Sequence, residues 1–327
     1  MSDAAMHGAA LATARRKTAR RDLLLSLTLL GLLLLMWAFL SIDTRTFLTG
    51  RNILNLMRQS SLFAIIAMGQ TFVIITAGID LSVGAVIGFA GVIVTLLISN
   101  GVPIAAAIAI TLLVGVAIGS FHALGVTKLG LPPFIMTLAT LTALRGIGLL
   151  ITNGASIEGL PDSFTGFSQG AFLGVPNLFW MVIVVAIPGY VLLSHTRWGR
   201  YLFAIGSNAE AARLSGVSVT RTIYLAYILS ATLAAFAGIL TASRLGIGNA
   251  TTGTGYELQA IAASVIGGTS LFGAVGSIQG PLLGSFVLST INNGANLLNV
   301  NSFVQQIITG GLIIAIVYFD QLRRRRR

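Results

Sequence analysis

Residues 199–217 read GRYLFAIGSNAEAARLSGV, a polar and charged stretch between two long apolar runs. Ser207, followed three residues later by Glu210, fits a capping box, in which the hydroxyl accepts from the Glu210 amide and the carboxylate reaches back. The pattern predicts a short helix over about residues 208–214. Gly216 comes just after that helix, where glycine can end it as a left-handed C-terminal cap.

The predicted short helix carries small side chains. Ala209, Ala211 and Ala212, together with Gly216, leave a surface against which another protein can pack. Helices of this length do not form alone in water, so a packing partner is expected. An ordinary loop between two longer helices is the alternative interpretation of the same residues.

The composition is that of a membrane protein. Of the 327 residues, 55% are hydrophobic and only 9% are charged, whereas soluble domains carry about 25% charge. There is no cysteine, so nothing points to a disulfide scaffold or a thiolate metal site. A net charge of +11 would suit nucleic-acid binding, but the basic runs flank apolar segments. The positive-inside rule explains that placement without a nucleic acid.

Apolar runs long enough to cross a bilayer alternate with polar breaks along the chain. A basic arm at residues 1–22 precedes a transmembrane domain at 23–322, and a basic tail at 323–327 follows it. Residues 153–177 are interpreted as an outer loop. We count ten spans, which begin near residues 23, 53, 82, 103, 133, 178, 223, 258, 278 and 303. The predicted fold class is therefore an all-α polytopic membrane protein.

Basic residues are distributed unevenly between the two sides of this topology. The inner segments hold fifteen of the twenty Lys and Arg residues: five before Asp22, Lys128, four in the central loop at about 196–222, and five at the C-terminus. Because basic segments are retained on the inner side of the membrane, both termini are expected in the cytoplasm.

Few residues are candidates for chemistry, and no catalytic, cofactor or metal site is expected. The chain has no G-x-x-x-x-G-K-[ST] motif, so any ATP hydrolysis is expected on a separate polypeptide. Asp80, at a break between two spans, is interpreted as a helix cap rather than a proton-coupling site. No acid, base and nucleophile converge in the sequence, which argues against a membrane-embedded enzyme.

Neutral amides near the outer end of the ninth span form a candidate substrate path. Asn292, Asn296 and Asn299 fall on one helical face, and Asn293 lies beside them. Amides suit sugar hydroxyls because they both donate and accept hydrogen bonds without carrying charge. A polar helix end at the membrane interface is the alternative.

Three stretches resemble one transporter family. Residues 206–216, GSNAEAARLSG, resemble the cytoplasmic coupling loop of ABC importer permeases, in particular the ribose/xylose/arabinose-type monosaccharide permeases. Residues 69–84, GQTFVIITAGIDLSVG, and 267–274, GGTSLFGA, resemble the same family. The likeness extends over about residues 52–319 and does not specify the sugar.

The resemblance implies a type II-importer-like permease subunit in the bacterial inner membrane, which imports a ribose-like monosaccharide by alternating access. Its implied partners are cytoplasmic ABC ATPase subunits that use ATP and Mg²⁺, a periplasmic sugar-binding protein and a second permease copy in a homodimer. The chain itself is expected to bind no cofactor. The coupling residues it implies are Gly206, Ser207, Asn208, Glu210, Ala211, Ala212 and Gly216. An ion- or proton-coupled secondary transporter is the alternative function.

Overall fold

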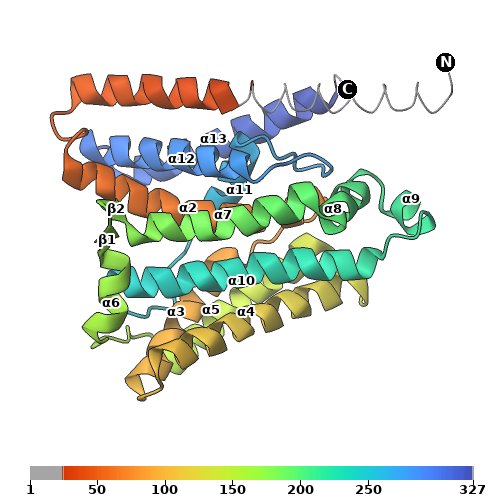
Figure 1. Cartoon of the computed structure of the whole chain (residues 1–327), viewed down its shortest axis with the longest axis horizontal. Coiled ribbons are helices and arrows are strands. Elements are labelled where there is room, and N and C mark those ends of the chain that lie inside the picture. The colour runs from red at the N-terminus through yellow and green to blue at the C-terminus, as the bar shows by residue number, and fades with distance from the viewer. Residues whose placement is uncertain (1–23, 25, 326–327) are drawn as a thin grey trace.

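The computed structural model describes residues 24 and 26–325, which form a bundle of helices (Figure 1). A first helix, Ser26–Asp43, opens the bundle. The helices that follow are α2 (Gly50–Ile75), α3 (Val83–Ser99), α4 (Ile104–Thr127), α5 (Pro133–Thr152), α6 (Asp162–Gln169), α7 (Asn177–His195), α8 (Arg197–Ser207), α9 (Ala209–Leu214), α10 (Val219–Leu245), α11 (Tyr256–Ile266), α12 (Gln279–Leu297) and α13 (Ser302–Arg325). The predicted N-terminal arm at 1–22 lies outside the described residues.

Prolines and a threonine begin several of these helices. Pro103 and Pro132 are the N-caps of α4 and α5, and Pro133 occupies the first position of α5. Proline suits a helix start because its φ is already helical and its missing N–H has no partner to lose there. Thr49 caps α2 by accepting a hydrogen bond from the Asn52 amide at 3.4 Å. The predicted starts of these helices are confirmed to within a few residues.

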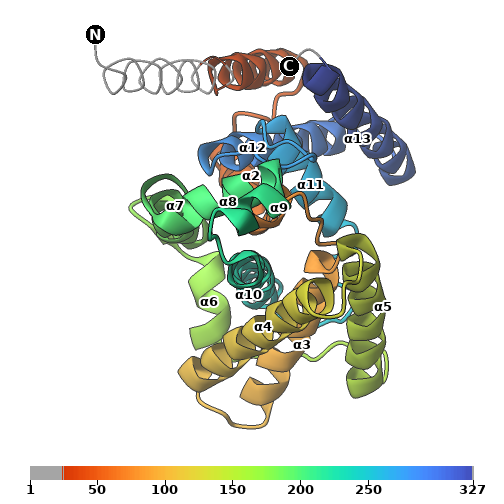
Figure 2. The same cartoon turned by 90° about the vertical axis from the view of Figure 1, so that its right-hand side faces the viewer.

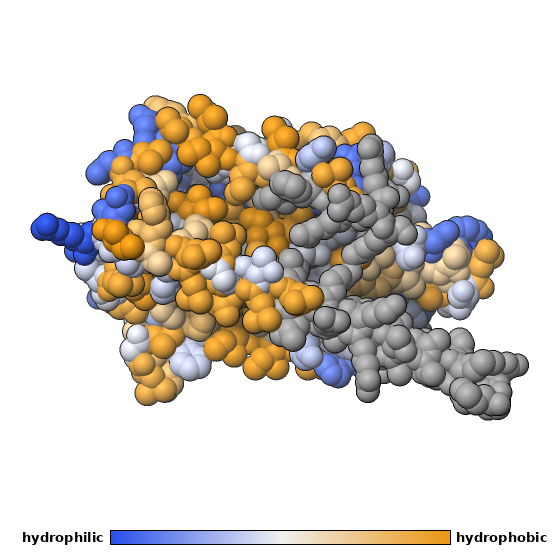
Figure 3. Space-filling view, turned by 90° about the horizontal axis from the view of Figure 1, so that it is seen from above, coloured by the Kyte–Doolittle hydropathy of each residue, from blue (hydrophilic) through white to orange (hydrophobic). Residues whose placement is uncertain are grey.

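α2 and α10 form the centre of the bundle. α2 packs against α7, α10, α11 and α12, and α10 packs against α2, α3 and α4. Figure 2 shows α10 surrounded by other helices, with α7 on one side and α5 and α13 on the other. Few residues of α7 and none of the described residues of the Ser302–Leu322 span of α13 are buried in this chain, and hydrophobic side chains cover much of the face drawn in Figure 3. Such surface is stable in a bilayer because lipid tails are as apolar as leucine.

The described residues contain seven helices that are long and apolar enough to cross a membrane, namely Ser26–Asp43, α2, α4, α5, α7, α10 and α13. α3 has 17 residues and α11 has 11. Each follows a non-helical segment, residues 76–82 before α3 and residues 246–255 before α11. α12 has 19 residues but is more polar, with three asparagines in its last two turns. The fold is therefore a polytopic helical membrane protein, and helix length alone does not establish the expected count of ten spans.

Two regions differ from the sequence prediction. Residues 153–177 are not a plain loop, because they contain α6 and a hairpin of β1 (Ala171–Phe172) with antiparallel β2 (Val175–Pro176). Leu173 and Gly174 both have positive φ, 52° and 76°, the combination that turns a two-residue hairpin tightly. The basic tail expected at 323–327 begins inside α13, which extends to Arg325, and residues 326–327 lie outside the described part.

Glycines allow α4 and α10 to pack with their backbones almost in contact. A Cβ atom on Gly119 would lie 2.5 Å from the Ile228 Cα atom, and one on Gly115 would lie 2.8 Å from the Ala235 Cβ atom. Real Cβ atoms do not approach so closely, so α4 and α10 would have to separate to accommodate larger residues. Close approach of this kind is a main source of helix association in membranes.

We predict that Gly119→Ala lowers the melting temperature of the purified protein, because overpacking a tight contact costs about 1–3 kcal/mol. Gly146→Ala, on α5, is the matched control. Nothing lies within 4 Å of a Cβ atom at Gly146, so that change should leave the melting temperature unchanged or raise it through helix propensity. Equal melting temperatures for the two variants would contradict the packing described here.

Candidate coupling surface and the helix breaks beneath it

The predicted coupling loop is a chain of two short helices at one end of the bundle (Figure 1). α7 leads into α8 through Thr196, whose hydroxyl accepts a hydrogen bond from the Gly199 amide at 3.4 Å. Leu202 and Ile205 of α8 are buried, whereas Arg197 and Arg200 are exposed. With one side buried and the other exposed, α8 lies across the ends of the longer helices. α9 follows, and α10 then returns into the bundle.

Asn208, not Ser207, caps α9. The Asn208 side chain accepts a hydrogen bond from the Ala211 amide at 2.9 Å, while Ser207 is the last residue of α8. The predicted capping box is therefore wrong by one residue, because α8 extends through the serine and leaves the asparagine in extended backbone. Glu210 bonds forward to Arg213 instead of backward to the cap.

The hydrogen bond with Arg213 lowers the pKa of the Glu210 carboxyl, and the same bond raises the pKa of the Arg213 guanidinium. A carboxyl group whose pKa is lowered in the folded state stabilises that state above its unfolded pKa and loses this effect as the pH falls. Both side chains are fully exposed, so the pair contributes little to overall stability at neutral pH. It steadies α9 locally as an i,i+3 pair.

Gly216 ends α9 as predicted. Its φ is +83°, and its amide donates to the Arg213 carbonyl at 3.0 Å. The Val217 amide donates to the Ala212 carbonyl, also at 3.0 Å. These two bonds form a Schellman motif, in which glycine avoids the steric cost that a side chain would incur in left-handed backbone. The expected left-handed cap at Gly216 is confirmed.

The small residues of α9 do not all face outward. Ala212 is buried against the bundle, whereas Ala209 and Ala211 are exposed. Leu214, at the tip, is 75% exposed. Ala212 is therefore small because it packs inside this chain, and the apolar part of the surface that α9 leaves open consists of Ala209, Ala211 and Leu214.

Directly beneath α8, two breaks in the helical bundle meet. The first break, residues 76–82, separates α2 from α3, and the second, residues 267–278, separates α11 from α12. The Ala274 amide of the second break donates to the Ile75 carbonyl at the end of α2, at 2.9 Å. A Cβ atom on Gly206 would overlap that carbonyl oxygen and lie 2.6 Å from the Ala274 nitrogen. Only glycine allows α8 to rest on both breaks.

Each break is bonded to the helices around it. In the first, the buried Asp80 carboxylate accepts from the Ser82 amide and hydroxyl, at 2.9 and 2.6 Å, and from the Ser230 hydroxyl of α10 at 2.8 Å. In the second, the Asp320 carboxylate of α13 accepts from the Ser270 hydroxyl and the Leu271 amide, at 3.1 and 3.0 Å. The N-cap of α3 is Ser82, whose side chain makes no capping bond, so the predicted cap at Asp80 is wrong: Asp80 instead organises the turn that precedes α3.

The candidate amides lie at the far end of α2 from this contact. Asn293 and Asn52 exchange two side-chain hydrogen bonds, at 2.8 and 3.1 Å, and Asn296 accepts from Gln305 at 2.9 Å. α12 ends at Leu297, and Asn299 has a φ of +55°. The expected helical face of Asn292, Asn296 and Asn299 is therefore interrupted, because the chain turns before the third asparagine.

Comparison with known proteins identifies the family. The family described as "Branched-chain amino acid transport system / permease component" matches residues 52–317. The chain belongs to this family. Its relatives include the ribose import permease protein RbsC of Escherichia coli K12, 40% identical over 89% of this chain and 92% of the relative. RbsC of Bacillus subtilis is 43% identical over 89% and 91%, and the xylose transport system permease protein XylH of Escherichia coli K12 is 33% identical over 86% and 87%. No solved structure matches the chain.

A pair of alanine substitutions in this permease distinguishes the two capping arrangements. Asn208→Ala should remove the α9 cap, which is worth about 1 kcal/mol, and so speed amide hydrogen exchange in α9 about fivefold. Ser207→Ala, the adjacent control, should leave exchange in α9 unchanged. Faster amide exchange in Ser207→Ala alone would show that Ser207 caps α9 after all, as the capping box predicted.

Proposed function

We propose that this chain is the membrane-spanning subunit of an ABC importer that carries ribose or a similar monosaccharide into the cell. Relatives named for ribose, allose and xylose transport match most of the chain. The observation that carries the proposal is α9, a capped helix that exposes Leu214 at one end of the bundle while α8 rests on both helix breaks. An exposed leucine suits an apolar pocket on a partner, because its burial there removes apolar surface from water.

In this proposal a cytoplasmic ATPase subunit binds α9 and uses ATP and Mg²⁺, while the permease does no covalent chemistry. Movement of α9 pulls on α8, with which it packs. Because Gly206 lies directly against Ile75 and Ala274, α8 cannot shift without displacing the end of α2 and the second break together. Protein interiors transmit such displacement because they are close-packed. Rearrangement of the two helix breaks then opens the transport path to one side of the membrane and closes it to the other, which is alternating access.

The proposed topology has ten passes with both termini in the cytoplasm, in a bacterial inner membrane. Seven passes correspond to the long apolar helices, and α3, α11 and α12 supply the other three. Short helices continued by irregular chain are tolerated at membrane depth where neighbouring helices satisfy the backbone. The hydrogen bonds of Asp80 and Asp320 supply partners of this kind at the two breaks. The uneven distribution of basic residues supports the orientation.

A second copy of the permease and a periplasmic sugar-binding protein complete the proposed importer. None of the described residues of the Ser302–Leu322 span of α13 is buried in this chain, and nothing lies within 4 Å of Cβ positions at Gly310 and Gly311. Such a surface suits close contact with another membrane helix. The binding protein would dock at the opposite end from α9, where α6 and the β1–β2 hairpin lie (Figure 1).

The docking assignment is tested by Leu214→Asp. Burying an unpaired carboxylate in an apolar contact is costly, so the variant should accumulate in membranes normally but lose its ATPase during purification. Leu173→Asp is the matched control, because Leu173 is 78% exposed at the opposite end. If Leu214→Asp retains the ATPase as fully as Leu173→Asp does and still supports ATP-dependent uptake of labelled ribose, α9 is not the docking site and the proposed function fails.

The amides of the proposed substrate path separate into two groups that substitution can distinguish. Asn293→Ala breaks the reciprocal pair with Asn52, and interhelical bonds in membranes are worth about 0.6 kcal/mol, so a slightly lower melting temperature is expected. Asn292 makes no side-chain hydrogen bond among the described residues. Asn292→Ala should therefore lower sugar uptake, measured at equal abundance, without changing the melting temperature. Normal uptake in that variant would assign the amides to structure alone.

A further inference from the structure

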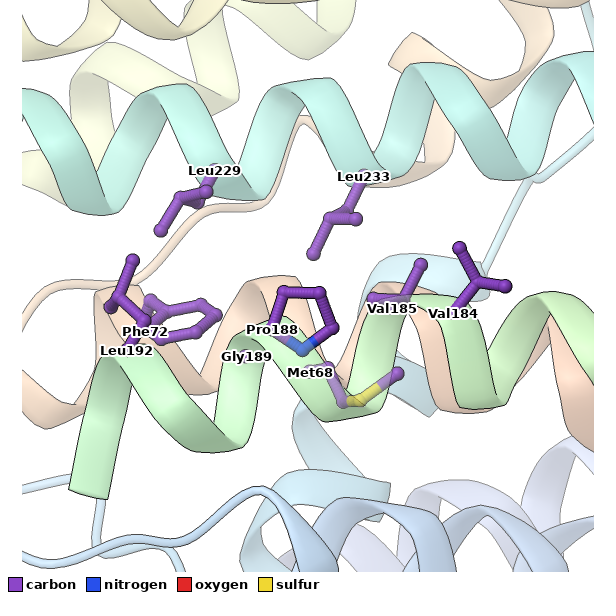
Figure 4. A pocket seen from close by; sticks show the side chains of 9 residues that line it. All are labelled: Met68, Phe72, Val184, Val185, Pro188, Gly189, Leu192, Leu229 and Leu233. Carbon is purple, nitrogen blue, oxygen red and sulfur yellow. The ribbon is translucent and has the colours of Figure 1, made fainter. Parts of the chain in front are cut away.

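α7 and α10 run side by side without packing tightly together. Each packs against α2, but the two make few direct contacts with each other. They leave an apolar groove of about 190 Å³ between them, with α2 as its floor (Figure 4). The groove is lined by Met68, Phe72, Val184, Val185, Pro188, Gly189, Leu192, Leu229 and Leu233.

The lining comes from one stripe of each helix. Met68 and Phe72, four residues apart on α2, are buried and form the floor. Leu229 and Leu233 of α10 point toward Val185 and the other α7 residues across the groove (Figure 4). Val184 is 57% exposed, so the groove opens sideways to the surroundings rather than forming a closed cavity.

The chemistry of the lining excludes polar occupants. Every lining side chain is apolar, so a sugar would lose its hydrogen bonds to water without replacement. Apolar cavities of comparable size stay free of water and take up apolar molecules instead. An α-helix of another subunit, about 10–12 Å across, is too wide for a groove of this volume.

The position of the groove identifies the medium that meets it. Val184–Leu192 is in the middle and second half of α7, and Leu229 and Leu233 are in the middle of α10. Both helices are candidate membrane spans, and the middle of a span is surrounded by lipid hydrocarbon. α7 also lies on the opposite side of the bundle from α5 and α13 (Figure 2), away from the face proposed to meet the second copy.

We propose that the groove between α7 and α10 is a binding site for one hydrocarbon chain of a membrane phospholipid. A flexible chain can fill the space between the two rows of side chains and make the van der Waals contacts that an empty groove would forfeit. Bound there, it would fill the space between α7 and α10 and still allow their separation to change.

The lipid chain in the groove also affects transport, an inference that rests on the proposed function. α7 runs directly into α8, and α10 emerges directly from the turn after α9, so the lipid chain separates the two helices that carry the coupling surface. A change in the position of α8 and α9 must alter the spacing of α7 and α10, and with it the fit of the chain. Uptake by this permease should therefore depend on acyl-chain occupancy of the groove.

The test uses the full-length permease reconstituted in vesicles of phosphatidylethanolamine and phosphatidylglycerol doped with a phosphatidylcholine that carries a diazirine in mid-chain. After illumination, labelled peptides are mapped by mass spectrometry. We expect label on groove residues of α7 and α10 and at least a fivefold loss of that label in Val185→Trp, which fills the groove. Ile187→Trp is the matched control, because Ile187 is 60% exposed on α7 and does not line the groove; it should keep the groove label.

Two results would overturn the site. One is label spread evenly over outward residues of α7 with none in the groove, and the other is equal groove labelling in both tryptophan variants. If Val185→Trp does not fold, judged by gel filtration, Leu233→Phe replaces it with a smaller increase in volume. Labelling requires neither ATPase nor sugar, so its failure is distinct from failure of the proposed function, which the ATPase co-purification decides.

Discussion

The backbone contact between Gly206, Ile75 and Ala274 is the constraint on which the rest of the arrangement depends. A helix that lies across the end of the bundle meets the carbonyl that ends α2 and the amide of the second break at distances open only to glycine. In the two breaks the backbone has positive φ at four residues, Ala77, Gly268, Gly273 and Ala274. Alanine in that conformation is strained, and such strain persists where the surroundings over-determine it.

α2 connects this contact to the opposite end of the molecule. From Asn52 to Ile75 it rises about 35 Å at 1.5 Å per residue, nearly the thickness of a bilayer. One end is held to α12 by the paired amides of Asn52 and Asn293, and the other end is held by the second break under α8. A helix that is buried on almost all sides and fixed at both ends is suited to transmit a displacement from one face of the membrane to the other.

The helices that flank the coupling surface are, by contrast, loosely held to each other. α7 and α10 share α2 as their support and leave an apolar groove between them. The tight contact beneath α8 and the open groove beside it have different physical consequences. The direct contact of Gly206 with the backbone of Ile75 and Ala274 resists a change in spacing, whereas a groove filled by a fluid chain permits it. The permease thus combines a rigid connection to the breaks with a compliant one between the helices on either side of the loop.

The sequence by itself determined the membrane class, the helical character, the starts of helices at Pro103 and Pro132, and the left-handed cap at Gly216. These features depend on composition and on residues within one turn of each other, so a local pattern is sufficient to predict them. The family, too, was recognisable from local motifs. Only the tertiary structure decided that Ala212 faces inward, that Asn293 bonds Asn52, and that Gly206 lies against the point where two breaks meet. Each of these depends on which distant segments meet, and no local spacing encodes that. The cap at Asn208 was missed for a related reason: buried Leu202 and Ile205 hold α8 against the bundle as far as Ser207, and this packing moved the helix boundary by one residue.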